Sequence, residues 1–314
     1  MTIAHWDDID SYRRAKGEMD GTWQRLGDAA GTLTVGVNRI RIAPGKLSTP
    51  PHSHGASEEI FFVLGGSGLS WQDEEAYEVR AGDCIVHLAD HEEHTLRAGD
   101  DGLDVLVYGT RHPTELGWLP RSQAIRLGWP WVQGRTDDPW DVEAEQPRLE
   151  FGTAAARPAN IVNLDEVTPD EDGWKLLGER AGSKQSGLNW VQLAPGLESS
   201  PLHCHSEEEE FFVVLDGQAT LELWPAPIAA DRGMKREEHS VRAGHVIARP
   251  PASRVAHALR AGPDGVTYLV YGTRKPNDIC YYPRSNKIYW RGVGVIGRIE
   301  HLDYWDGESR GVTN

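Results

Sequence analysis

Cysteine is scarce in this chain, with three residues among 314. Cys84, Cys204 and Cys280 are too few and too scattered for a disulfide framework or a thiolate zinc site, so we expect free thiols in a reducing compartment. Long apolar runs are lacking too. The run Ile60–Leu64 has five residues, far below the roughly 18 that a membrane-spanning helix needs. The first residues mix acids and bases and contain no apolar core of a secretory signal. We therefore expect a cytoplasmic protein with no membrane segment.

Positive charge is also in short supply. The chain has 32 Lys and Arg residues against 48 Asp and Glu residues, which gives a formal net charge of −16. A field of this sign repels nucleic-acid phosphates and anionic lipids. We therefore expect neither a nucleic acid nor a membrane as partner. A small-molecule substrate is favoured, and assembly into a homo-oligomer stays open.

Extended helical periodicity is weak along the sequence. The stretch Asp7 to Lys16 and the segment after Val162 are candidates for short helices, but neither carries a long 3.6-residue apolar period. Short β-branched and aromatic runs dominate instead, such as VGVNRIRI at 35–42 and EEIFFVL at 58–64, and Gly or Pro clusters separate them. This pattern predicts an all-β fold of the barrel or sandwich type, with short helices at its periphery.

The second half of the sequence repeats the first. An offset of 151 places Ala43-Pro44-Gly45 on Ala194-Pro195-Gly196, and an offset of 163 later places Tyr108-Gly109-Thr110-Arg111 on Tyr271-Gly272-Thr273-Arg274. The second copy is longer because of a stretch rich in Pro, Ala and charge between Gly217 and Gly244. We predict two domains, residues 1–150 and 151–314, the second with an inserted loop at 224–240. At a barrel rim such a loop would cover the second site, or it would serve a subunit contact.

Each copy carries two histidines separated by one residue. Residues i and i+2 of a strand project from the same face, so His52 converges with His54, and His203 with His205. Glutamates follow, and the repeat selects those that lie five residues after the second histidine and seven before a glycine. A third histidine comes later in each copy. The predicted metal ligands are His52, His54, Glu59 and His94 at one site and His203, His205, Glu210 and His257 at the other.

Three neutral imidazoles and one carboxylate suit a divalent first-row metal, and Fe, Mn, Zn, Ni, Co or Cu are all compatible with them. We therefore expect up to two such ions per chain, each with coordination positions left for water or substrate. His87 and His91 flank the third histidine of the first copy and are expected to be titrating surface residues. No general acid or base can be named from the sequence.

These residues resemble a motif of the cupin superfamily, and the duplication resembles the bicupins. The pattern HxH-x4-E-x6-G is matched by residues 52–66 and again by residues 203–217. A second cupin motif is only partly matched, since Ala98 and Ala261 stand where the family usually has Asn after the third histidine. The resemblance spans nearly the whole chain. It implies two tandem double-stranded β-helix (jelly-roll) barrels, each with a metal site inside.

The resemblance also implies a metal-dependent activity on a small organic molecule. A dioxygenase-type oxidoreductase is the leading hypothesis. The alternatives are a redox-neutral metal enzyme (an isomerase, decarboxylase or lyase) and a non-catalytic cupin that only binds a small molecule. The fold and the ligands do not choose among these activities.

Overall fold

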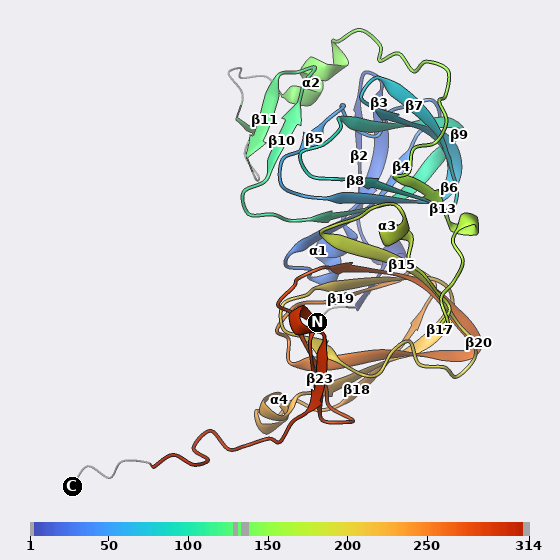
Figure 1. The fold of residues 1–314 in the computed structure, drawn as a ribbon. Helices are drawn as coiled ribbons and strands as arrows, with labels where there is room; N and C mark the ends of the chain where they lie inside the picture. Colours follow the sequence, from blue (N-terminus) through green and yellow to red (C-terminus); the bar gives the residue numbers. More distant parts are fainter. Residues whose placement is uncertain (1–2, 128–130, 133–137, 310–314) are drawn as a thin grey trace.

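The computed structural model describes residues 3–127, 131–132 and 138–309. Figure 1 shows two β-barrels stacked one above the other, the first from the blue-to-green half of the chain and the second from the yellow-to-red half. The helices are short, and none in the described part of the chain is long and apolar enough to cross a membrane. The prediction of an all-β fold with two barrels is confirmed.

The first barrel is built on an eight-stranded antiparallel sheet in the order β13-β8-β6-β9-β4-β3-β2, with β7 paired to β6. Its strands are β2 (Ser11–Lys16), β3 (Met19–Gln24), β4 (Val35–Ile42), β6 (Glu59–Gln72), β7 (Glu75–Arg80), β8 (Asp83–His87), β9 (His94–Thr110) and β13 (Ile161–Asn163). A smaller sheet lies beside it and contains β5 (Ser53–His54), β10 (Leu116–Leu119), β11 (Ala124–Leu127) and β12 (Trp131–Val132). The short helices of this half are η1 (Trp6–Asp8), α1 (Leu26–Ala30) and α2 (Pro139–Ala144).

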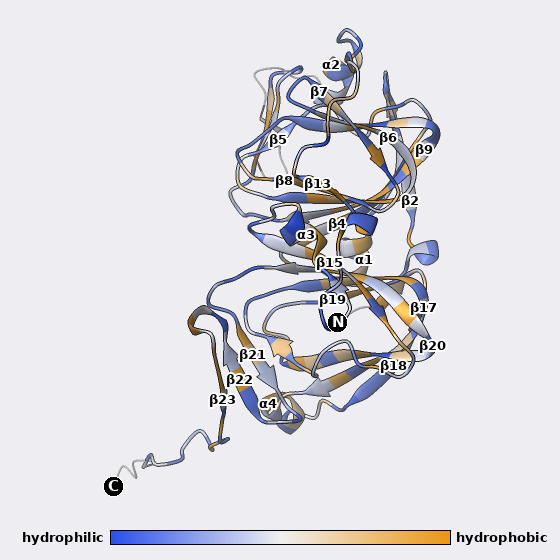
Figure 2. Ribbon diagram, turned by 45° about the vertical axis from the view of Figure 1, so that its right-hand side comes forward, coloured by the Kyte–Doolittle hydropathy of each residue, from blue (hydrophilic) through white to orange (hydrophobic). Residues whose placement is uncertain are grey.

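The second barrel repeats this plan with a seven-stranded sheet in the order β1-β19-β17-β20-β15-β14, with β18 paired to β17. Its strands are β1 (Ile3–His5), β14 (Trp174–Lys175), β15 (Ser186–Leu193), β17 (Glu210–Pro225), β18 (Glu237–Arg242), β19 (His245–Arg249) and β20 (Val255–Thr273). Its side sheet contains β16 (Cys204–His205), β21 (Ile279–Tyr282), β22 (Lys287–Trp290) and β23 (Val295–Arg298), and Figure 2 shows β21, β22 and β23 along one flank. The helices are η2 (Leu164–Glu166), α3 (Leu177–Arg180), α4 (Pro227–Asp231) and η3 (Arg291–Val293).

The two halves exchange their first strands. Strand β1, from the start of the chain, pairs with β19 of the second barrel. Strand β13, which follows the predicted boundary near residue 151, pairs with β8 of the first barrel. The boundary itself stays a prediction, but each of the two large sheets contains backbone from both sides of it.

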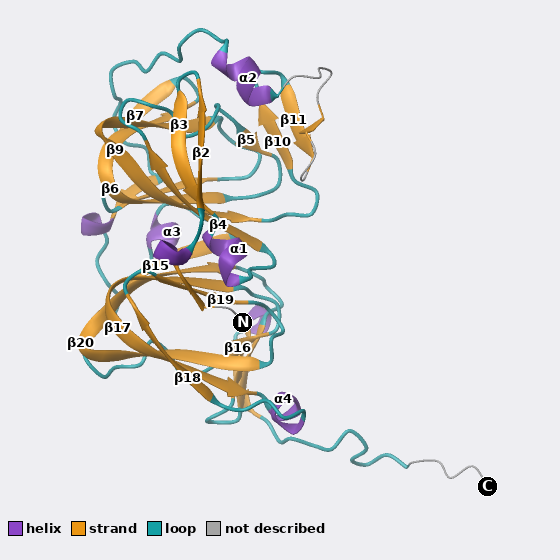
Figure 3. Ribbon diagram, turned by 180° about the vertical axis from the view of Figure 1, so that it is seen from behind, coloured by secondary structure: helices purple, strands orange, loops and turns teal. Residues whose placement is uncertain are grey.

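Strand alternation divides the core into three parts. Along β6, Phe61 and Val63 face the interior of the first barrel, whereas Ile60 and Phe62 point into a cluster between the barrels. The second copy places Phe212 inside its own barrel and Phe211 in the shared cluster. Figure 3 shows α1 and α3 lying between the barrels.

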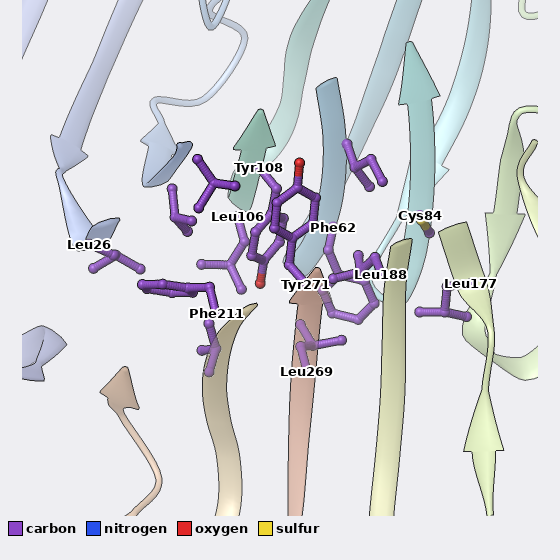
Figure 4. Close-up of a cluster of buried hydrophobic side chains, with 14 of the residues drawn as sticks. Leu26, Phe62, Cys84, Leu106, Tyr108, Leu177, Leu188, Phe211, Leu269 and Tyr271 are labelled. Atoms are coloured by element: carbon purple, nitrogen blue, oxygen red, sulfur yellow. The ribbon is translucent and has the colours of Figure 1, made fainter. Parts of the chain in front are cut away.

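The centre of the shared cluster is a pair of equivalent tyrosines. The rings of Tyr108 and Tyr271 stack with centroids 5.1 Å apart, and both side chains are fully buried. Figure 4 shows this pair surrounded by apolar side chains of both halves, among them Phe62, Leu188 and Phe211. The apolar faces of the two barrels therefore bury each other.

Two expectations about local structure are wrong. The stretch Asp7–Lys16 is not helical beyond η1, because residues 11–16 form β2 and pair with β3. The segment 224–240 is not a loop: Trp224 and Pro225 end β17, α4 follows, and β18 begins at Glu237. The ladder from Gln218↔Arg242 to Leu223↔Glu237 continues the hairpin and satisfies its backbone groups.

Candidate metal centres

Four side chains meet at the first candidate centre. One ligand atom from each of His52, His54, Glu59 and His94 lies within 4.8 Å of the others. His54 ends β5, His94 begins β9 and Glu59 begins β6. His52 precedes β5 and forms an isolated β-bridge with His94. The Oε2 atom of Glu59 lies 3.1 Å from His94 Nε2 and 3.7 Å from His54 Nε2. The four predicted residues thus converge on one point.

Each imidazole of the first centre is oriented through its other nitrogen. The Nδ1 atom of His52 lies 2.9 Å from the Pro50 carbonyl, and that of His94 lies 3.3 Å from the Glu92 carbonyl. The Nδ1 atom of His54 is 3.3 Å from Glu115 Oε1. Metal-binding histidines usually donate their second N–H to such carbonyl or carboxylate groups. Hydrogen bonding at Nδ1 leaves the Nε2 atoms for the centre.

The second candidate centre repeats this arrangement. The ligand atoms of His203, Glu210 and His257 lie within 4.8 Å of one another. The Oε2 atom of Glu210 lies 2.8 Å from His257 Nε2 and 3.5 Å from His205 Nε2. The Nδ1 atom of His203 contacts the Pro201 carbonyl at 2.8 Å. Three of the four predicted residues of this copy therefore meet at one point. The fourth, His205, adjoins them through Glu210 and forms a second group with Asp278 and Cys280.

Several buried atoms of these centres have no hydrogen-bond partner among the described residues. At the meeting points they are His54 Nε2 in the first centre and His205 Nε2, Glu210 Oε2 and His257 Nε2 in the second, where the 2.8 Å contact between Glu210 and His257 lacks hydrogen-bond geometry. His257 Nδ1, on the other side of its ring, has no partner among the described residues either. Buried polar atoms in folded proteins are normally paired. A divalent cation at the meeting point would satisfy the Nε2 and Oε2 atoms together, and imidazole with carboxylate is the donor set that first-row transition metals accept. The residues present therefore fit the metals expected from the sequence.

The charges at the two centres follow one scheme. Burial, reinforced by neighbouring imidazoles, lowers the pKa of His52 to about 3 and that of His94 to about 4. Burial also disfavours the charged form of His54, but the nearby carboxylates of Glu115 and Glu59 outweigh it and raise that pKa to about 10. At the second centre the pKa of His205 rises to about 11 against the effect of burial, because Glu210 and Asp278 face it. Without a metal, one imidazolium therefore offsets the charge of only one of the two carboxylates at each centre.

Two functional residues were missed in the sequence. Glu115 holds His54, and Asp278 holds His205 at an Nδ1–Oδ2 distance of 2.7 Å. The two carboxylates occupy equivalent positions at the offset of 163, close after the matching Tyr-Gly-Thr-Arg segments. Each is fixed by backbone N–H groups, for example from Ser57 to Glu115 and from Glu207 to Asp278. A search of the repeat for paired carboxylates would have found them.

Comparison with known proteins places this architecture. Residues 38–108 match the family model of the cupin domain. This match covers most of the first barrel, which is thus a cupin domain, and the second barrel repeats its fold and its HxH motif. A search of curated proteins found no match to the chain.

Solved structures with a similar fold include oxalate decarboxylases from two bacteria. A structure of the Bacillus subtilis enzyme at pH 4.6 is 14% identical, with 86% of this chain and 75% of that chain covered and a TM-score of 0.58. A formate complex of the Lactobacillus farciminis enzyme is also 14% identical, with 87% and 86% covered and a TM-score of 0.59. Another structure of the Bacillus subtilis enzyme concerns its Mn(II) centres and has a TM-score of 0.57. At this identity the likeness establishes the two-barrel fold of the chain.

The glutamates beside the candidate ligands join the two halves of the chain. Glu58 is fully buried and accepts hydrogen bonds from Ser183 Oγ and the Lys184 N–H, both at 2.6 Å. Glu209, from the second half, binds a loop of the first half in the same way and accepts hydrogen bonds from the N–H groups of Leu33 at 2.8 Å and Thr34 at 2.5 Å. Strand alternation thus separates the two candidate glutamates of each copy. One faces the histidines, and the other binds a loop of the opposite half.

The residues that pack beside the two centres differ between the barrels. His87 is not a surface residue: it is 2% exposed, and its ring stacks on His94 at a centroid distance of 3.8 Å. Its Nδ1 atom contacts Glu92 at 2.6 Å. In the second barrel the register position of His87 is taken by Arg249, which pairs with Glu210 as His87 pairs with Glu59. The expectation failed because a turn-flanking histidine looks the same in sequence whether exposed or packed on a neighbour.

A cavity of about 480 Å³ opens onto the second centre of the cupin. His203, His205 and Glu210 line its inner end, and aromatic and polar side chains from β20 and the side sheet line its walls. The segment 224–240 contributes no lining residue, so the expectation that it covers this site is wrong. It borders a separate groove instead, where the Arg236 guanidinium lies 3.3 Å from the centroid of the Trp224 ring. Strands β21 and β22 occupy the place expected for a lid.

Proposed function

We propose that this bicupin is a metal-dependent enzyme that acts on a small organic acid by redox-neutral cleavage of a carboxylate, as a decarboxylase does. The observation that carries the proposal is the second centre, where His203, Glu210 and His257 form a cluster, His205 adjoins it at 3.5 Å from Glu210, and a cavity of about 480 Å³ opens onto them. A donor set for a metal and space for a substrate occur at the same place. The neighbours in fold are oxalate decarboxylases, one with Mn(II) centres and one holding formate, which favours this chemistry over the dioxygenase hypothesis.

The side chains of the second centre have separable tasks in this proposal. His203, His205, Glu210 and His257 would hold a divalent transition metal such as Mn. When bound, that ion supplies Lewis acidity to a coordinated carboxylate oxygen. Asp278 orients His205 through its Nδ1 atom, and the apolar wall around Phe212 limits the access of water.

A decarboxylation also needs a proton. Breaking the bond to the carboxylate carbon releases CO2 and leaves an electron pair on the remaining carbon, which must be protonated. The Tyr282 hydroxyl lies in the cavity wall. Burial raises the pKa of Tyr282 to about 12, so the group keeps its proton at neutral pH and is our candidate donor.

The experiment follows two gases. The full chain, loaded with Mn(II), is incubated with a panel of small carboxylic acids while CO2 release and O2 uptake are recorded together. We expect CO2 release without net O2 uptake, and its loss in Glu210→Gln. O2 consumed in step with substrate would support the dioxygenase hypothesis. A metal-loaded protein that binds acids but converts none would support the non-catalytic alternative.

We also propose that a second copy of this chain is a partner. Leu116 and Trp118 of β10 pair across the sheet with Leu127 and Ile125 of β11, so all four share one face, and all four are exposed. The C-terminal segment exposes Leu302, Tyr304 and Trp305. Figure 1 shows this segment leading away from the second barrel, while β10 and β11 lie on the first. The two apolar surfaces of one chain are therefore far apart, and a second copy would bring them together.

A further inference from the structure

We propose that the second centre takes a planar aromatic acid, with its ring among Tyr268, Tyr282 and Tyr289 and its carboxylate toward the histidine cluster. This inference rests on the proposed function because it assigns a substrate class to the same site. It concerns binding alone. The three tyrosines border the cavity of about 480 Å³, Tyr282 and Tyr289 with partly exposed side chains and Tyr268 as a fully buried residue of the barrel core.

The first step in the argument is the difference between the two copies. At the offset of 163, the positions of the three tyrosines hold Val105, Leu119 and Arg126 in the first copy. The strand registers support this correspondence, because Ile279 pairs with Trp290 as Leu116 pairs with Leu127. The first barrel forms the same sheets with aliphatic and basic residues at these positions. Folding therefore does not require tyrosine there.

The second step is the position of the rings. The ring of Tyr282 stacks against that of the candidate ligand His203, with centroids 5.7 Å apart and an interplanar angle of 28°. On the barrel side, Tyr268 packs against Phe212 at 5.9 Å, and Phe212 in turn contacts His257 at 5.6 Å. Aromatic surface thus begins at the candidate ligands themselves. A ring whose carboxylate reaches the centre would meet the flat faces or edges of these side chains, which is the geometry that aromatic pairs favour.

The third step is size. The cavity volume of about 480 Å³ falls within the range of pockets that enclose drug-sized ligands. A two-carbon diacid such as oxalate would leave most of this space to water and would touch few of the aromatic side chains. An aryl carboxylate would bury its ring against them, so apolar contact would add to its affinity.

The test measures binding to the full-length, Mn(II)-loaded protein by titration calorimetry. The probes are benzoate, cyclohexanecarboxylate as the non-planar control of similar size, and oxalate. We expect benzoate to bind about tenfold more tightly than cyclohexanecarboxylate, since stacked aromatic pairs gain affinity beyond their buried area. Equal affinity of the two ring acids, or tighter binding of oxalate than of benzoate, would overturn the proposal.

Variants locate the effect. Tyr268→Val, Tyr282→Leu and Tyr289→Arg introduce the residues of the first copy, and each should weaken benzoate binding about three- to tenfold while leaving cyclohexanecarboxylate nearly unchanged. The matched control is Tyr281→Leu, because Tyr281 belongs to the same strand as Tyr282 but contacts His301 outside the cavity. Its benzoate affinity should stay at the wild-type value. Metal content and thermal unfolding show that each variant is folded and loaded.

The outcomes separate this inference from the proposed function. Benzoate binding with the expected variant pattern, but no CO2 release from any acid, would support the aromatic site and contradict the decarboxylase proposal. CO2 release from aliphatic acids with no measurable benzoate binding would support the proposed function and overturn the aromatic site. Loss of benzoate binding in Tyr281→Leu as large as that in Tyr282→Leu would also overturn it, because the effect would then not come from the cavity.

Discussion

At the scale of single residues, the carboxylates that hold His54 and His205 allow metal binding at each centre to be changed separately by mutation. Replacing Asp278 by Asn keeps the size of the side chain but removes the charge that holds the Nδ1–H of His205. We expect metal affinity at the second centre to fall about 10- to 100-fold, the usual cost of losing such a partner. Competition with a chelator, followed by elemental analysis, measures this change.

The matched variant is Glu115→Gln, which does the same at His54. Each variant should release about one of two bound ions at a chelator concentration that the wild-type protein withstands. Equal loss from both centres in either variant would show a general loss of structure. No loss at all would show that the carboxylates do not act through the metal ligands.

The raised pKa values of two histidines predict a pH dependence of metal binding. His54 and His205 have pKa values of about 10 and 11 without metal, above the ordinary value near 6.5, so both are protonated at pH 7.5. An imidazole must lose this proton to bind a metal. Binding should therefore release about one proton per centre at pH 7.5, and affinity should rise about tenfold per pH unit toward pH 9.

His52, His94 and His257 do not contribute to this release, because their pKa values lie near 3 or 4 and their rings are already neutral. Calorimetry in two buffers of different ionisation enthalpy counts the protons. A count near zero at both centres would contradict the prediction. In the metal-free protein, folding stability changes with pH in the opposite direction to metal affinity. The raised pKa values stabilise the fold below about pH 6.5, and this contribution is lost as the pH rises through 10.

At the scale of elements, the adjacent glutamates separate folding from metal binding. In Glu58→Gln an NH2 group replaces one of the two oxygens that bind the loop at 183–186. We expect the free energy of unfolding to fall by about 1–3 kcal/mol, as for other buried groups left without partners. Metal content should stay near that of the wild type, because Glu58 points away from the cluster. Denaturant unfolding and elemental analysis test both parts.

Glu59→Gln is the paired variant and should show the reverse pattern. It should lose the metal of the first centre while the joint between the halves stays intact. The assignment of the two glutamates would be wrong if Glu58→Gln lost metal and Glu59→Gln kept it. The same comparison can be made with Glu209 and Glu210, since Glu209 binds the loop at Leu33 and Thr34.

Features that depend on local strand periodicity could be predicted from the sequence, whereas features that depend on the pairing of distant segments could not. The HxH pairs, the choice of Glu59 over Glu58, and the apolar alternation along 58–64 follow from strand periodicity, so they could be predicted. The hairpin at 224–240 could not, because Pro, Ala and charged residues look like a loop until the register of β17 and β18 is known. Position 87 failed for a related reason, since its burial depends on the stacking of His87 on His94.

The exchange of β1 and β13 belongs to the scale of the whole molecule and has no local sequence pattern. Each strand is three residues long, and its partner lies far away in the chain, with Ile3 opposite Ile247 and Ile161 opposite Ile85. Together with the buried glutamates and the stacked Tyr108 and Tyr271, this exchange ties the barrels into one unit. The two candidate centres therefore sit on a common frame, although their surroundings have diverged.

The state of assembly is the final expectation at this scale. If the exposed face of β10 and β11 receives the C-terminal segment of a second copy, wild-type protein should be a dimer or larger by light scattering. Removing residues 299–314 deletes Leu302, Tyr304 and Trp305, and Trp118→Ser removes the largest side chain of the receiving face. Each change should shift the protein toward the monomer, because apolar contact area is the main attraction between such surfaces.

Leu33→Ser is the control, since Leu33 is 64% exposed and belongs to neither surface. It should leave the mass unchanged. A monomeric wild-type protein, or a truncated protein that keeps the wild-type mass, would contradict the assembly. Metal content should be the same in all four proteins, because neither surface contains a candidate ligand. A loss of metal on truncation would instead show that the C-terminal segment supports the second centre of its own chain.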